Sequence, residues 1–178
     1  MNPIKNFIEK IEQQNLWDNR LELNRKEYLK VKGSVDTNLY FVVSGSLRIY
    51  VLEEFEENII RFGYKNNFIA SLDSFISEKP SDLYIQAIKK SELKVINKTT
   101  FMDFVESSTE NTRIWHTMLG DLIFQQMERE RYILTSSPLE RYKRVLTRSP
   151  QLFQEIPNKY IASYLRMTPE TLSRIKKS

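Results

Sequence analysis

The sequence predicts an α+β chain with an N-terminal antiparallel β-barrel or sandwich, one long helix and a C-terminal helix-turn-helix. Three observations lead to this prediction. Short extended segments separated by turn residues fill the region from Leu21 to Ile96, as in sandwiches and barrels. A proline-free stretch of about 25 residues, from Glu110 to Leu134, then keeps helical spacing. The last quarter of the chain contains two short helical patterns and has a net positive charge.

The extended segments alternate apolar and polar residues, as strands with one buried face do. Residues 46–51 alternate in this way, and Ser44-Gly45 just before them is a turn signal. No helix of 10–15 residues alternates with the strands, which argues against a parallel α/β sheet. The predicted strands cover residues 21–23, 28–31, 39–43, 47–51, 59–62, 68–69, 84–88 and 93–96.

The composition excludes several kinds of site. Cysteine is absent and His116 is the only histidine, so we expect no disulfide, no metal and no cofactor. The sequence has no Ser–His–Asp arrangement and no glycine-rich phosphate loop, so we do not expect an enzyme. No apolar run approaches the roughly 20 residues that span a bilayer, and the N-terminus lacks the apolar core of a signal peptide. We therefore expect a cytoplasmic protein without membrane contact, beginning with an amphipathic helix capped by Asn2.

The long helical segment needs a partner for its apolar side. About 25 residues at 1.5 Å each extend ~37 Å, more than the diameter of a small domain. A second copy of the same helix is the simplest partner, and packing on the chain's own barrel is the alternative. The residues predicted to form the dimer helix contact are Ile114, Met118, Leu119, Leu122 and Ile123.

A domain border is expected where the long helix ends. Thr135-Ser136-Ser137 is a polar hinge, and Ser137, Pro138 and Glu140 have the spacing of a capping box at the start of a new helix. We therefore divide the chain into a sensor domain at 1–108, a long helix and hinge at 109–135, and a helix-turn-helix domain at 136–178.

The segment from residue 156 to the end predicts two short helices joined by a tight turn at Arg166-Met167. The small Ala162 on the first helix allows the second helix to approach closely. Thr168 is the expected cap of the second helix, and Leu172 lies on its inner face. Arg166 stands where such a turn often has glycine, so a positive φ there would cost on the order of 1 kcal/mol.

The outer face of the second helix suits DNA. Arginine donates two hydrogen bonds to guanine, and glutamate accepts from cytosine. Residues 139–178 hold nine Lys/Arg against three Asp/Glu, a net charge of +6 that would attract a polyanion. An ordinary helical hairpin with a polar face is the alternative. The expected DNA-binding residues are Lys159, Thr168, Glu170, Thr171, Ser173, Arg174 and Lys177.

Residues 156–165 and 168–175 resemble the helix-turn-helix of the Crp/Fnr superfamily, with Glu170 and Arg174 in its Glu-Thr-x-x-Arg motif. Residues 39–48 resemble the early hairpin of the superfamily's cyclic-nucleotide-binding (cNMP) jelly-roll barrel. The resemblance implies a bacterial transcription regulator that binds double-stranded DNA as a homodimer, has RNA polymerase as a candidate partner, and responds to a small-molecule effector. A sensor module whose helix-turn-helix contacts protein, or binds DNA only weakly, is the alternative. The chain ends three residues after Ile175, without the superfamily's usual wing, so we expect modest DNA affinity.

The sequence departs from the superfamily at the phosphate-binding cassette. Ala70-Ser71 replaces the Gly-Glu pair that would hold the ribose, and Ser81-Asp82 replaces the Arg-Ser pair that would neutralise the phosphate. We therefore expect no useful affinity for cyclic AMP or cyclic GMP. The barrel could hold another small ligand or be filled by its own side chains. The candidate pocket residues are Phe68, Ile69, Ala70, Ser71, Leu72, Ser81, Asp82 and Leu83, with Phe75 also expected at the lining.

Overall fold

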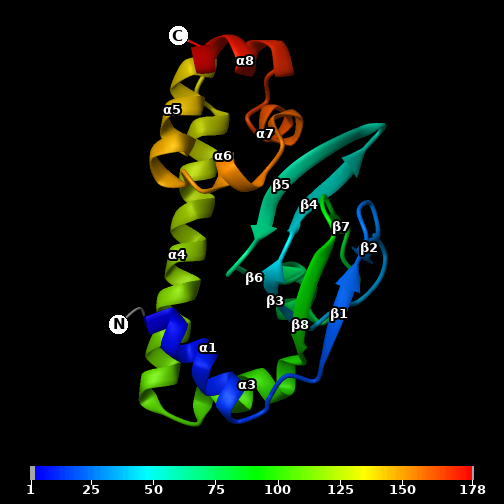
Figure 1. The fold of residues 1–178 in the computed structure, drawn as a ribbon, viewed down its shortest axis with the longest axis vertical. Helices are drawn as coiled ribbons and strands as arrows, with labels where there is room; N and C mark the ends of the chain where they lie inside the picture. The colour runs from blue at the N-terminus through cyan, green and yellow to red at the C-terminus, as the bar shows by residue number, and fades with distance from the viewer. Residues whose placement is uncertain (1–2, 178) are drawn as a thin grey trace.

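The computed structural model describes residues 3–177 and consists of a β-barrel beside one long helix, with a group of short helices at one end (Figure 1). Helix α1 (Pro3–Gln13) precedes the barrel. The predicted cap at Asn2 lies outside the described residues. Within those residues, no helix is both long and apolar enough to cross a membrane.

The barrel is made of two four-stranded antiparallel sheets, which confirms the predicted α+β fold with its jelly roll. One sheet has the order β1 (Asn19–Leu23), β8 (Ser91–Ile96), β3 (Leu39–Ser44) and β6 (Phe68–Ile69). The other has the order β2 (Tyr28–Lys30), β7 (Tyr84–Ala87), β4 (Ser46–Glu53) and β5 (Glu56–Tyr64). Alternate residues point inward, and the barrel core contains Leu23, Tyr40, Val42, Leu47, Ile49, Ile69, Ile85, Ala87, Leu93 and Val95.

The turn between β3 and β4 requires glycine. Gly45 has a φ of +84°, and a Cβ at this position would lie 2.3 Å from the carbonyl oxygen of Lys90. Any side chain would therefore displace the backbone that precedes β8. The turn signal at Ser44-Gly45 marks this position correctly.

One end of the barrel is closed by an aromatic cluster. Phe7 of α1 packs against Phe101 and Phe104 of α3 (Lys98–Glu106), with ring centroids 6.1 and 5.0 Å apart. Asn97 caps α3 by accepting a hydrogen bond from the Thr100 amide at 2.9 Å. The short helix α2 (Leu72–Ser77) adds Phe75 to the same cluster.

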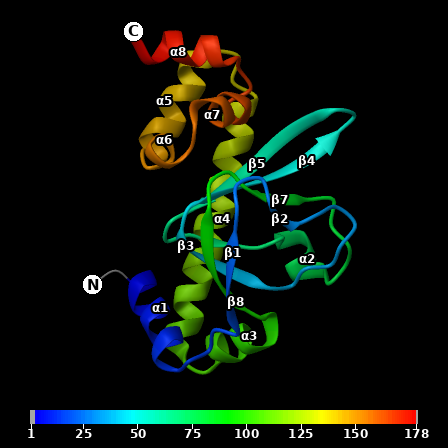
Figure 2. The same ribbon diagram turned by 45° about the vertical axis from the view of Figure 1, so that its right-hand side comes forward.

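The long helix α4 (Thr109–Ile133) joins the two ends of the molecule. Figure 2 shows α1 and α3 near one end of α4, and α5 to α8 at the other end beside the β4–β5 hairpin. These four helices are α5 (Pro138–Arg148), α6 (Leu152–Glu155), α7 (Asn158–Tyr164) and α8 (Pro169–Lys177). They share one apolar core with Tyr50, Ile59 and Phe62 of the hairpin.

Candidate functional site

The turn between α7 and α8 is a helix end with one residue in the left-handed region. The Met167 amide donates to the Ala162 carbonyl, and the Arg166 amide donates to the Ser163 carbonyl, both at 3.0 Å. Arg166 has a φ of +52°. The turn therefore does have the positive φ at Arg166 whose cost the sequence raised. A non-glycine residue in this conformation costs about 1 kcal/mol.

Helix α8 begins as the sequence predicts, because the Thr168 hydroxyl accepts a hydrogen bond from the Thr171 amide at 3.2 Å. Leu172 is fully buried against α7 and α5. Thr171 is partly buried, and its hydroxyl lies 3.1 Å from that of Thr168. The helix is therefore held at its start, and its orientation relative to α7 is fixed by packing.

The exposed face of α8 carries Glu170, Ser173, Arg174 and Lys177, which together with Pro169 surround one shallow hollow. Hydrogen bonds from its own backbone amide and from the Thr168 hydroxyl lower the pKa of Glu170. This carboxylate therefore stays ionised at neutral pH and can act only as an acceptor.

Lysines extend the positive surface from α8 to α7. Lys159 is exposed, with its Nζ atom 4.6 Å from the centroid of the Tyr160 ring. Lys176 donates to the Asn158 side-chain oxygen at 3.1 Å and so joins the end of α8 to the start of α7.

Arg141 on α5 positions this unit, although no motif in the sequence distinguishes it from the other arginines. It is 9% exposed. Its guanidinium donates to the carbonyls of Thr135 and Ser136 in the hinge, at 2.7 and 3.0 Å. It also donates to the carbonyls of Leu165 and Arg166 in the α7–α8 turn, at 2.9 and 3.1 Å. One side chain thus ties the end of α4 to the turn that presents α8.

The position of the phosphate-binding cassette is filled by the protein itself. Lys30 is 4% exposed, and its Nζ atom donates to the carbonyls of Val31, Ser81 and Leu83 at 3.1, 3.4 and 3.1 Å. Burial lowers the pKa of Lys30, and nearby carboxylates including Asp73 partly oppose this shift. The Ser71 hydroxyl donates to the Ser81 hydroxyl at 3.1 Å.

The structure places the predicted pocket residues in several different surroundings. Ile69 and Leu83 belong to or pack on the barrel core, and Ser71 and Ser81 are buried against each other. Leu72 begins α2 and is partly exposed. The remaining residues face elsewhere: Phe68, Ala70 and Phe75 join the aromatic end cluster, and Asp82 is exposed and pairs with Lys32 at 3.2 Å.

Replacing Lys30 with methionine should lower the free energy of unfolding by about 2 kcal/mol, because three carbonyls, that of Ser81 within a buried hydrogen bond, lose a charged donor. Urea unfolding of the wild type and the variant measures this difference. Lys32→Met is the matched control, since the Lys32 side chain is 52% exposed and its ion pair contributes about 0–1 kcal/mol. Equal losses in the two variants would contradict the structural role of Lys30.

The exposed side of α4 differs from the predicted dimer helix contact. Ile114 and Met118 pack into the end cluster, and Leu122 faces the barrel side of α4, so their assignment to a free helix face is corrected. Leu119 is partly buried. Of the predicted five, Ile123 is clearly exposed, at 60%, and it is joined by Phe124 and Met127 at 61 and 57%.

The exposed side of α4 also has a heptad pattern that was not predicted from the sequence. Gly120, Ile123, Met127 and Leu134 fall on positions 3, 4 and 7 residues apart, as along the contact line of paired helices. A Cβ placed on Gly120 would meet nothing within 4 Å. The helix backbone is therefore accessible at this point.

Comparison with known proteins agrees with this architecture. The family model for the cyclic nucleotide-binding domain matches residues 20–108. Among solved structures, FixK2 from Bradyrhizobium japonicum is 16% identical with a TM-score of 0.73, over 89% of this chain and 82% of that one. The c-di-GMP responsive global regulator CLP of Xanthomonas campestris is 16% identical with a TM-score of 0.67, over 97% and 90% of the two chains.

The catabolite activator protein of Thermus thermophilus is 15% identical, with a TM-score of 0.60 over 99% of this chain and 85% of that one. A search of curated protein sequences finds no match. At these identities the structural likeness establishes the fold, and it covers the barrel, α4 and the C-terminal helices together.

Proposed function

The chain belongs to the cyclic nucleotide-binding domain family, and from this premise we propose that it is a DNA-binding transcription regulator of the Crp/Fnr type. The resemblance seen in the sequence is confirmed for the barrel's family and for the fold. The single observation that supports the proposal most is the exposed face of α8, where Glu170 and Arg174 project together. The three parts of the chain, 1–108, 109–135 and 136–178, would serve as sensor, connecting helix and DNA-binding domain in the cytoplasm.

The chemistry of α8 suits the edges of base pairs in the major groove. Arg174 can donate two hydrogen bonds to the O6 and N7 atoms of guanine, and Glu170 can accept one from the N4 amine of cytosine. Ser173, Lys177 and Lys159 can contact phosphates, which position the helix without selecting a sequence. Thr168 and Thr171, which bond to each other at the helix start, would place the α8 N-terminus near the backbone.

A homodimer would present two copies of α8 to one duplex. The exposed heptad face of α4, centred on Ile123 and Met127, is the proposed contact. Two-fold symmetry would set the recognition helices about 34 Å apart, one turn of DNA, so that the operator is palindromic. Through this assembly the protein would act on transcription, with RNA polymerase as the further partner.

We expect no response to cyclic AMP or cyclic GMP. Lys30 occupies the cassette and is hydrogen-bonded to three carbonyls, and no arginine or glutamate stands at the four cassette positions. Isothermal titration with either nucleotide, up to about 1 mM, should show no saturable heat. At this concentration a dissociation constant in the micromolar range would be detected. Binding at micromolar concentration would contradict this expectation.

The proposed function is tested by selecting binding sites from randomised duplexes of about 26 base pairs, long enough for two half-sites. We expect a palindromic consensus, with affinity that falls with salt at a slope of about −4 or steeper. Failure to enrich any sequence, together with a shallow salt dependence, would instead favour a helix-turn-helix that contacts protein.

A further inference from the structure

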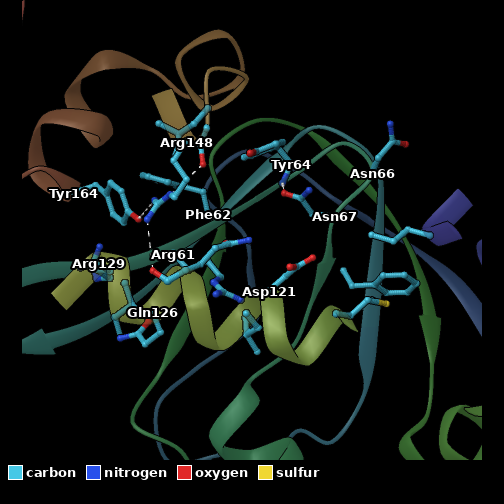
Figure 3. Close-up of a pocket in the computed structure, with 18 residues that line it drawn as sticks. Arg61, Phe62, Tyr64, Asn66, Asn67, Asp121, Gln126, Arg129, Arg148 and Tyr164 are labelled. Atoms are coloured by element: carbon cyan, nitrogen blue, oxygen red, sulfur yellow. Dashed lines mark hydrogen bonds between the residues drawn. The ribbon is translucent and has the colours of Figure 1, made fainter. Parts of the chain in front are cut away.

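A pocket of about 270 Å³ lies where the barrel, α4 and the C-terminal helices meet, apart from the cassette and from the exposed face of α8. Three arginines line it from three different elements: Arg61 from β5, Arg129 from α4 and Arg148 from the end of α5. Figure 3 shows Arg61 reaching from β5 toward α4, while Arg148 and Tyr164 approach from the C-terminal helices. We call this site the three-arginine pocket.

None of the three arginines forms an ion pair with a carboxylate in the part of the chain that the structure describes, residues 3–177. Elsewhere the pattern differs, since Arg48 pairs with Glu57 on the barrel. Around the pocket, Asp121 is the only carboxylate among the described lining residues, and it is exposed. One carboxylate against three guanidinium groups leaves the three-arginine pocket with a net positive charge.

The arginines are held in place by neutral groups. Arg129 is 9% exposed and donates to the Tyr132 hydroxyl at 2.8 Å and to the Ile59 carbonyl at 2.5 Å. Arg148 donates to the Tyr164 hydroxyl at 3.3 Å. The Arg61 guanidinium forms no hydrogen bond with any residue that the structure describes. Arg61 thus keeps all five of its N–H donors for another partner.

The titration of nearby groups reflects this accumulation of charge. Burial and the repulsion of Arg148 and Arg129 lower the pKa of Arg61. Burial alone would raise the pKa of Tyr164, but the positive charges of Arg129 and Arg148 and hydrogen bonds to its hydroxyl lower it overall. Buried like charges without a counter-charge are costly, and an anion bound among them would remove this cost.

We propose that the three-arginine pocket binds a small oxyanion with at least two negative charges, and that this anion is an effector of the protein. Guanidinium groups recognise phosphate and carboxylate oxygens in pairs through parallel N–H donors. Asn66, Gln125 and Gln126 line the same pocket, and a side-chain amide can donate to further anion oxygens. The volume lies just below the ~300–1,000 Å³ of pockets for drug-sized ligands, so the ligand is a compact phosphorylated or polycarboxylate molecule.

The regulatory part of this inference rests on the proposed function, whereas the binding part does not. An anion held by Arg61, Arg129 and Arg148 would join the barrel to α4 and to the C-terminal helices. It would stabilise the arrangement in which α7 packs on β5, and so fix the position of α8 relative to the sensor. A ligand shifts such an equilibrium in proportion to its preference for one arrangement.

The test is isothermal titration of the full chain, without DNA, with sodium pyrophosphate and with sodium citrate, at constant ionic strength set by sodium chloride. We expect one saturable site per chain at micromolar concentration for at least one of the two anions, and which anion binds distinguishes the phosphate class from the carboxylate class. Arg61→Gln should weaken binding by roughly tenfold or more. Arg20→Gln, at an exposed ion pair with Glu92 on the barrel surface, should leave it unchanged.

A second measurement separates a ligand site from a structural cluster. Without anion, Arg61→Gln should unfold at the wild-type temperature or above it, because it removes one of three repelling charges and breaks no side-chain hydrogen bond within the described residues. Absence of saturable binding by both anions would overturn the proposal, as would equal weakening by Arg61→Gln and Arg20→Gln. Since no DNA is present, either result is independent of whether α8 reads an operator.

Discussion

Replacing Arg141 with methionine is expected to lower the free energy of unfolding by about 3–4 kcal/mol, because four carbonyls lose a buried charged donor at once. The stability of a typical domain is only about 5–15 kcal/mol. The affected carbonyls belong to the hinge and to the α7–α8 turn. We therefore expect specific DNA binding to disappear together with the fixed position of α8.

Urea unfolding followed by fluorescence and by circular dichroism measures the effect of Arg141→Met. Arg144→Met is the matched control on the same helix, because the Arg144 side chain is 42% exposed and lies 4.0 Å from Glu140, a pair worth less than about 1 kcal/mol. A loss below 1 kcal/mol in Arg141→Met, or a loss equal to that of the control, would contradict the assigned role.

Introducing a charge at the centre of the exposed α4 face is expected to dissociate the proposed dimer. In Ile123→Glu, two carboxylates related by symmetry would face each other in an apolar contact, where unpaired charges are strongly disfavoured. Sedimentation equilibrium at about 10 μM should give the 21.3 kDa mass of one chain for the variant and twice that for the wild type. Binding to a palindromic site should weaken about 100-fold or more, because the second half-site no longer binds intramolecularly.

Phe55→Glu is the control for the dimer experiment. Phe55 is 98% exposed at the tip of the β4–β5 hairpin, which points away from α4 (Figure 1). Phe55→Glu therefore also replaces an exposed apolar side chain with a carboxylate, but at a site outside the proposed contact. A wild-type chain that is monomeric at this concentration, or an Ile123→Glu variant that remains dimeric, would contradict the proposal that α4 forms the dimer contact.

Local signals in the sequence were sufficient for the strands, the long helix and the C-terminal helix pair, but not for the short helices α2 and α6. The caps at Ser137 and Thr168 accept the hydrogen bonds that their spacing predicts, at 3.4 and 3.2 Å. The left-handed turn at Arg166 and the outward placement of Glu170 and Arg174 follow from the same local rules. Each of these features depends on residues no more than about five positions apart, which is the range over which such rules operate.

Features that depend on distant contacts were not predictable. Helix α4 has apolar residues on two sides, and only the packed barrel decides that Ile114 faces inward and Met127 outward. Lys30 enters the cassette from a strand about fifty residues away in sequence. A buried arginine such as Arg141 has the same sequence signal as an exposed one, so only its carbonyl partners reveal it.

Whether α8 reads base edges is tested by measuring the affinities for the selected operator and for each single-base-pair substitution of it. Arg174→Ala should lose roughly 1–3 kcal/mol of binding and lose discrimination at one base pair in each half-site. Lys177→Ala, which would remove only a phosphate contact, should weaken all duplexes equally and reduce the salt slope by about one per site. An Arg174→Ala variant that keeps wild-type affinity and discrimination at every position would contradict the account.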